Sequence, residues 1–190
     1  MKKDIILCGV GGQGILSIAT IIGEAATEAG IYLKQAEVHG MSQRGGSVVT
    51  YVKYGEEVFS PIIDKGEADI ILAFERLEAL RALPYLKKGG KIILNDRAIS
   101  PMPVITGAAE YPENIISFLS EKADVTALDA LELSMEAGSS KAVNVVLIGV
   151  LAATMDIEKE VWKKVITETV PQKFLDLNLK AFELGYNFKG

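Results

Sequence analysis

The stretch from Cys8 to Gly14, Cys-Gly-Val-Gly-Gly-Gln-Gly, constrains this chain more than any other feature. Gly9, Gly11 and Gly14 have the spacing G-x-G-x-x-G; an apolar run precedes them, and a helical pattern over residues 14–29 follows. Between a strand and a helix, such glycines allow a tight turn, close approach of the main chain to a ligand, and close helix–strand packing. The first free N–H groups of the helix and its positive dipole end would face this loop. We therefore expect an anion there.

The order of the expected elements predicts the fold class. Strands are expected at residues 4–8, 31–38, 68–74, 91–95 and 124–127, and helices at 14–29, 75–88, 113–122 and over most of the chain after residue 129. Residues 47–54 are rich in β-branched and aromatic residues, and Gly55-Glu56-Glu57 is expected to turn the chain back through residues 58–60 as a β-hairpin. We predict one α/β domain, residues 1–190. Its sheet would be Rossmann-like, open and mostly parallel, with an inserted β-hairpin and a helical C-terminal part.

Charge and composition narrow the function classes. The net charge of −5 argues against a partner that is a nucleic acid or an anionic membrane. The apolar runs are shorter than the roughly 20 residues that a membrane helix needs, and the N-terminus leads directly into a strand, so we expect a cytoplasmic protein. One cysteine, Cys8, and one histidine, His39, provide too few ligands for an iron–sulfur cluster or a zinc site, so no metal is expected on this chain. The 49% apolar content fits either a well-filled α/β core or an apolar surface that a partner subunit covers.

A second candidate segment runs from Glu37 to Ser47 at the end of an expected parallel strand, where open α/β sheets bind ligands. Its Arg44 guanidinium suits a phosphate or a carboxylate, and its Gln43 amide both donates and accepts hydrogen bonds. Glu37 lies 23 residues after Gly14, close to the position of a ribose-binding acid, so a free-standing NAD- or FAD-binding protein stays an alternative. An ordinary ion pair of Glu37 with Arg44 and a purely structural His39 also stay open.

Taken together, the segments Gly9–Gly14 and Glu37–Gly46 resemble the gamma-type subunits and domains of 2-oxoacid:ferredoxin oxidoreductases. Further similarity lies at Ser60-Pro61, at Gly66–Asp69 and at Lys141-Ala142-Val143-Asn144, so the resemblance covers essentially the whole chain. It implies a complex that oxidatively decarboxylates a 2-oxoacid, joins the acyl group to coenzyme A and passes electrons to ferredoxin. The implied substrate is indolepyruvate, with pyruvate, 2-oxoisovalerate and 2-oxoglutarate as alternatives.

The resemblance also implies where the cofactors lie. Thiamine diphosphate, Mg²⁺ and 4Fe–4S clusters would sit on a larger catalytic alpha subunit; the present sequence has no Gly-Asp-Gly of the kind that holds thiamine diphosphate. This chain would bind none of them alone and would contain no catalytic residue, and coenzyme A would be a co-substrate at a shared site. The candidates for contact with substrate, coenzyme A or the partner are Gly11, Gly12, Gln13, Gln43, Arg44 and Gly45, with Glu37, His39 and Asn144 as further candidates. A purely structural scaffold subunit is a further alternative.

Overall fold

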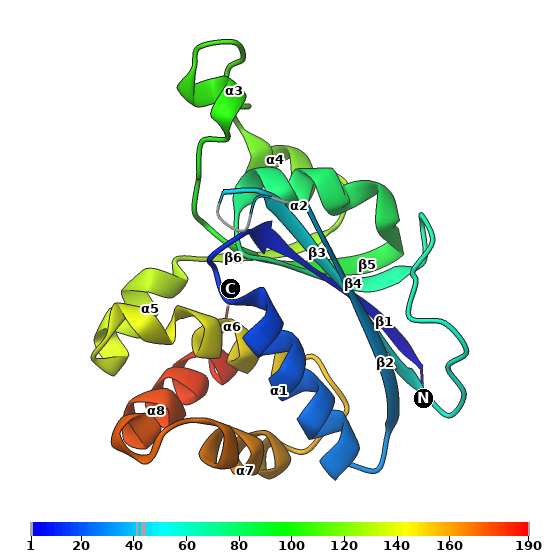
Figure 1. Cartoon of the computed structure of the whole chain (residues 1–190), viewed down its shortest axis with the longest axis vertical. Coiled ribbons are helices and arrows are strands. Elements are labelled where there is room, and N and C mark those ends of the chain that lie inside the picture. Colours follow the sequence, from blue (N-terminus) through cyan, green and yellow to red (C-terminus); the bar gives the residue numbers. More distant parts are fainter. Residues whose placement is uncertain (1, 41, 43–44, 190) are drawn as a thin grey trace.

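The computed structural model describes residues 2–40, 42 and 45–189 and shows a six-stranded sheet with helices on both faces (Figure 1). The strands are β1 (Lys3–Val10), β2 (Tyr32–His39), β3 (Ser47–Gly55), β4 (Ala68–Ala73), β5 (Leu86–Asn95) and β6 (Asp124–Leu128). The α-helices are α1 (Ile15–Glu28), α2 (Arg76–Ala82), α3 (Met102–Ile105), α4 (Ile115–Ser120), α5 (Ala130–Ala137), α6 (Val143–Ala152), α7 (Lys159–Thr169) and α8 (Leu175–Tyr186). Short 3₁₀ turns are η1 (Leu83–Tyr85), η2 (Ser140–Ala142) and η3 (Gln172–Phe174).

The strand order is β2-β3-β1-β4-β5-β6. Strands β1, β4, β5 and β6 pair in parallel, whereas β3 runs antiparallel to both of its neighbours, β1 and β2. All described strands except β3 therefore point the same way, and the predicted α/β class with a mostly parallel sheet is confirmed. The carboxyl ends of β1, β2, β4, β5 and β6 and the amino end of β3 share one edge, called here the carboxyl edge.

The predicted hairpin is wrong in its placement. β3 does not turn back through residues 58–60, because β1 and β2 already occupy both of its sides. The hairpin is instead formed by β2 and β3, and among the described strands β2 pairs only with β3, so it is an antiparallel edge strand. Residues 56–67 cross to β4 without a strand, held by hydrogen bonds from Lys34 Nζ to the Phe59 carbonyl and from Lys53 Nζ to the Ile62 carbonyl.

The predicted helix over residues 75–88 is also wrong at its end. Helix α2 stops at Ala82 and continues only as the 3₁₀ turn η1, because Pro84 has no backbone N–H to extend the α-helical hydrogen bonds. The chain then enters β5 at Leu86, earlier than the predicted Lys91. Gly89, directly after the end of the predicted helix, lies within β5 with φ of 77°, where the pairing with β4 is irregular.

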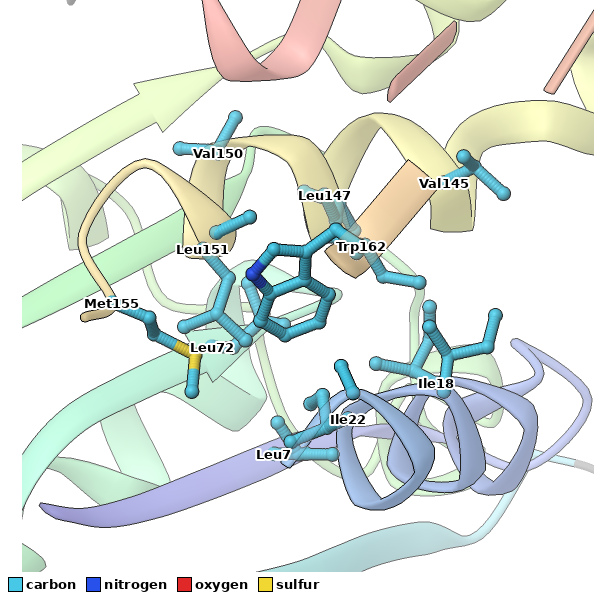
Figure 2. Close-up of a cluster of buried hydrophobic side chains, with 14 of the residues drawn as sticks. Leu7, Ile18, Ile22, Leu72, Val145, Leu147, Val150, Leu151, Met155 and Trp162 are labelled. Carbon is cyan, nitrogen blue, oxygen red and sulfur yellow. The ribbon is translucent and has the colours of Figure 1, made fainter. Parts of the chain in front are cut away.

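Alternating residues of β1 divide the core into two clusters. Ile5 and Leu7 point to the cluster covered by α1 and α6–α8, and Ile6 and Cys8 point to the cluster covered by α2 and α4. Buried Trp162 of α7 lies between α1 and α6 in the larger cluster (Figure 2). Both faces of the central strands are therefore apolar, as a covered parallel sheet requires.

Helix α6 is buried on all sides from Val145 to Ala152, which fits a helix enclosed by other helices. It packs against α8 through glycines on both helices. A Cβ on Gly149 would lie 2.3 Å from the Phe182 carbonyl oxygen, and a Cβ on Gly185 would lie 2.0 Å from the Val146 carbonyl oxygen. The backbones of the two helices therefore approach too closely for any larger side chain at these two positions. None of the described helices has the length and apolar character needed to cross a bilayer.

Candidate functional site

Two glycine loops meet at the carboxyl edge. The loop after β1 and the loop between β2 and β3 are joined by main-chain hydrogen bonds, from Gly11 N–H to the Gly46 carbonyl (2.8 Å) and from Gly45 N–H to the Gly11 carbonyl (3.2 Å). The structure thus brings together the two segments singled out in the sequence. Gln43 and Arg44 lie outside the described residues, so their predicted contacts stay predictions.

Gln13 fixes the shape of the first loop. Its side-chain Oε1 accepts a hydrogen bond from Val10 N–H at 2.7 Å, and its Nε2 donates to the Phe74 carbonyl at 3.0 Å. Its own N–H donates to the Val10 carbonyl at 3.1 Å. The amide therefore ties the loop to the end of β4. Gln13 is a positioning residue in this geometry.

Helices α1 and α6 begin close to each other. Gly14, with φ of 76°, precedes α1, and a Cβ built on it would lie 2.5 Å from Nδ2 of Asn144, the second residue of α6. Neither helix has a side-chain hydrogen bond at its N-cap or an acidic residue in its first turn. The first N–H groups and the positive dipole ends of α1 and α6 therefore converge beside the glycine loops. This arrangement favours an anionic group, such as a phosphate or a carboxylate.

Two buried carboxylates lie behind the loops. The Glu78 carboxylate accepts hydrogen bonds from Ser47 Oγ and from Arg81 Nη1, each at 2.5 Å. The Glu75 carboxylate caps α2 by accepting from Glu78 N–H at 3.0 Å. Glu78 thereby anchors the first residue of β3, directly after the Gly45-Gly46 turn. Neither residue was among the candidates from the sequence, although a pair of acids three residues apart directly after a buried strand was a usable signal of helix capping.

The other candidates occupy the rim of the site. Gly12 is exposed, and Glu37 lies on the edge strand β2, with Thr50 Oγ1 3.5 Å from its carboxylate. Because β3 separates β2 from β1, Glu37 is two strand spacings, roughly 10 Å, from the strand that carries the glycine motif. A ribose-binding acid sits on the strand next to β1 in a dinucleotide fold, so this order disfavours that alternative. His39 is exposed, with Nδ1 2.9 Å from the Gly40 carbonyl oxygen.

Cys8 is not placed for chemistry. Its thiol is buried and donates to the Glu78 carbonyl at a sulfur–oxygen distance of 3.5 Å. Burial raises the pKa of this thiol well above its ordinary value, and the Glu78 and Glu75 carboxylates raise the pKa further. The thiolate that nucleophilic attack or metal ligation needs is therefore suppressed. Among the described residues, no group of three His, Cys, Asp or Glu side chains could hold a metal ion.

Comparison with known proteins shows which proteins this chain resembles. Residues 4–188 match the family described as pyruvate ferredoxin/flavodoxin oxidoreductase. The indolepyruvate oxidoreductase subunit IorB of Thermococcus kodakarensis is 47% identical over 192 residues, which span 97% of this chain and 95% of that protein. The 2-oxoglutarate synthase subunit KorC of Methanothermobacter marburgensis is 30% identical over 190 residues, which span 97% and 95% of the two chains.

A solved structure supports the fold assignment. The gamma subunit of a keto/oxoacid ferredoxin oxidoreductase from Geobacter sulfurreducens superimposes with a TM-score of 0.72 at 24% identity, covering 97% of this chain and 96% of that one. At this identity the likeness establishes the shared fold. The assignment to a family rests on the sequence matches.

Proposed function

Because the chain belongs to the pyruvate ferredoxin/flavodoxin oxidoreductase family, we propose that it is the smaller subunit of an indolepyruvate:ferredoxin oxidoreductase. The match to an indolepyruvate oxidoreductase subunit over nearly the full length of both chains supports this choice of substrate. The complex would oxidatively decarboxylate an aryl 2-oxoacid, transfer the acyl group to coenzyme A and reduce ferredoxin. We place it in the cytoplasm, as a hetero-oligomer with a larger alpha subunit and with neither a nucleic acid nor a membrane as partner.

The cofactors of the reaction belong, in this proposal, to the larger subunit. Thiamine diphosphate with Mg²⁺ supplies the carbanion chemistry of decarboxylation, and 4Fe–4S clusters carry the electrons. The only thiol of the present chain, Cys8, is buried against a backbone carbonyl, which is unsuited to ligating a cluster. This chain would therefore shape and shield the site rather than perform the chemistry.

The observation that carries the proposal is the convergence of two glycine loops and two helix starts at the carboxyl edge. The N–H groups at the starts of α1 and α6 would bind a phosphate of coenzyme A or the carboxylate of the 2-oxoacid. The Gly11–Gly46 and Gly45–Gly11 hydrogen bonds would hold the loops in place for this contact. Arg44 would add a bidentate cation from the second loop.

The test uses the assembled complex and substitutes Arg44 with Ala and with Lys. Losing one charge-assisted contact to a phosphate is expected to raise the KM for coenzyme A about tenfold, with a smaller change in kcat. Lys should restore part of the affinity because it keeps the charge but loses the fork geometry. Lys88→Ala, which removes an exposed cation at the opposite end of the sheet, is the matched control. Unchanged turnover and unchanged coenzyme A dependence in Arg44→Ala would remove Arg44 from the proposal.

The substrate and the alternative functions are tested by two further measurements. The rates of the complex with indolepyruvate, pyruvate, 2-oxoisovalerate and 2-oxoglutarate rank the possible 2-oxoacids, and indolepyruvate is expected to be fastest. Calorimetry of the isolated chain with NAD, NADP and FAD tests the free-standing oxidoreductase, for which micromolar binding is the signature. A pure scaffold subunit predicts normal turnover and normal coenzyme A dependence in every variant of the glycine loops.

A further inference from the structure

Residues 98–112, called here the arm, leave the body of the molecule after β5 and carry the short helix α3. Figure 1 shows α3 projecting away from both helical layers. The sequence from Ala98 to Ala109 contains no charged residue, although 24% of the whole chain is charged. Met102 and Ile105 in this run are 66% and 65% exposed. Large apolar side chains on a projecting, uncharged segment indicate a surface that another protein covers.

The base of the arm is fixed to the carboxyl edge. Oε1 of Glu75, which is 1% exposed, accepts hydrogen bonds from Ile99 N–H at 3.0 Å and from the Tyr111 hydroxyl. Arg76 N–H donates to the Arg97 carbonyl at 2.9 Å. One buried carboxylate thus holds both ends of the arm to the start of α2. The tip is exposed, but its attachment is tied to the same edge that carries the glycine loops.

Two hollows continue the arm surface onto α4. A cleft of about 440 Å³ at the base of the arm is lined by residues that include Arg76, Ala98 and Tyr111. A neighbouring hollow of about 430 Å³ contains Leu80 and Phe118, and Phe118 is 44% exposed. The apolar tip is therefore accompanied by concave surface that can receive side chains of a partner.

We propose that the arm and these two hollows form the surface that docks this chain onto the larger, cofactor-bearing subunit. This docking proposal rests on the function proposed above. The arm leaves the carboxyl edge, so a partner that completes the site at the glycine loops also reaches the arm. The arm contains no Lys or Arg, and Arg76 in the cleft is paired with Asp96, which opposes an anionic membrane surface as the occupant. The net charge of −5 on each copy opposes self-association through this surface. An apolar groove on the larger subunit fits the uncharged tip.

The test measures binding of the purified chain to its cognate larger subunit. The test variant carries Met102→Ser together with Ile105→Ser, which keeps the arm and removes its exposed apolar side chains. The matched control is Phe59→Ser, because Phe59 is 86% exposed and follows β3 at the opposite edge of the sheet. The arm variant should bind the larger subunit about 100-fold more weakly than the parent chain, at roughly tenfold for each anchoring side chain. The affinity of the control variant should equal that of the parent chain. Unaltered circular dichroism and thermal midpoints should verify that both variants fold.

The outcomes separate this proposal from the proposed function. If the parent chain binds the larger subunit and the arm variant binds equally well, the docking proposal fails and the proposed function stands. If the parent chain does not bind the larger subunit, the proposed function fails as well. A dimer of the isolated parent chain in light scattering, converted to a monomer by the arm variant, would assign the arm to self-association and overturn the proposal.

Discussion

Gly14 gives a quantitative test of how closely α1 and α6 meet at the candidate site. Substituting Gly14 with Ala introduces two separate costs. The first is a side chain at φ of 76°, in the left-handed region, which costs about 1–2 kcal/mol. The second is a Cβ that would lie 2.5 Å from Nδ2 of Asn144, which must then move. Because Asn144 is a side chain rather than backbone, we take the lower end of the range for overpacking, about 1 kcal/mol. The expected loss is about 2–3 kcal/mol.

A second glycine isolates the backbone cost. Gly30, at the other end of α1, has φ of 72°, and its Cβ would meet nothing within 4 Å. Gly30→Ala should therefore lose only the left-handed cost of about 1–2 kcal/mol. The difference between the two variants, about 1 kcal/mol, is the contact with Asn144.

Urea unfolding of the parent, the two glycine variants, Asn144→Ala and the double variant Gly14→Ala with Asn144→Ala completes the cycle. In the Asn144→Ala background, Gly14→Ala should cost no more than Gly30→Ala does in the parent. Equal losses for Gly14→Ala and Gly30→Ala in the parent chain would refute the close approach of α1 and α6. So would an extra loss at Gly14 that persists after Asn144 is removed.

The remaining predictions concern packing, the buried carboxylate and the thiol. Gly185→Ala should destabilise the chain by about 3 kcal/mol or more in urea unfolding, because its Cβ would lie 2.0 Å from a backbone carbonyl of α6. Gly23→Ala in α1, with its nearest neighbours 3.9 Å away, should instead gain about 0.5–1 kcal/mol. Ser47→Ala removes a hydrogen-bond donor from the buried Glu78 carboxylate. It should lower the free energy of unfolding by about 1–3 kcal/mol and raise the KM for coenzyme A in the complex. Unchanged values of both would contradict the anchoring role of Glu78. Cys8 should resist thiol reagents at pH 8 until the chain unfolds. Because the pKa of this thiol is higher in the folded chain than in the unfolded chain, the free energy of unfolding should also fall as the pH rises past the unfolded thiol pKa of about 8.5.

Local sequence patterns predicted the parts of the fold that depend on local structure. The strand before the glycine motif and the helix after it follow from periodicity, whereas the alternation of Ile5, Ile6 and Leu7 between two cores is a finding of the structure. The end of α2 was also predictable, since Pro84 has no backbone N–H to extend the α-helical hydrogen bonds. The insertion of β3 between β1 and β2 could not be predicted, because strand pairing depends on long-range contacts that the pattern of one strand does not encode.

The candidate site likewise has features that the sequence predicted and features that only the structure shows. The two glycine loops were visible in the sequence because turns of this kind need glycine, but their hydrogen bonds to each other depend on the tertiary arrangement. Asn144 was a candidate only through family resemblance, and the structure places it against Gly14. Glu75 and Glu78 were missed because acids at a helix start are usually solvated caps, and only the packed structure shows that they are buried. The roles of Gly11, Gly12, Gln13, Gly45, Gln43 and Arg44 toward a ligand stay predictions.

Reconstitution of the complex tests whether its activity requires this chain. The purified chain is titrated into the larger subunit, and ferredoxin reduction is followed with indolepyruvate and coenzyme A. We predict that neither chain turns over alone and that the rate rises with added chain to a stoichiometric end point. A larger subunit that turns over at the full, coenzyme A-dependent rate without this chain would show that the chain is no part of the catalytic unit.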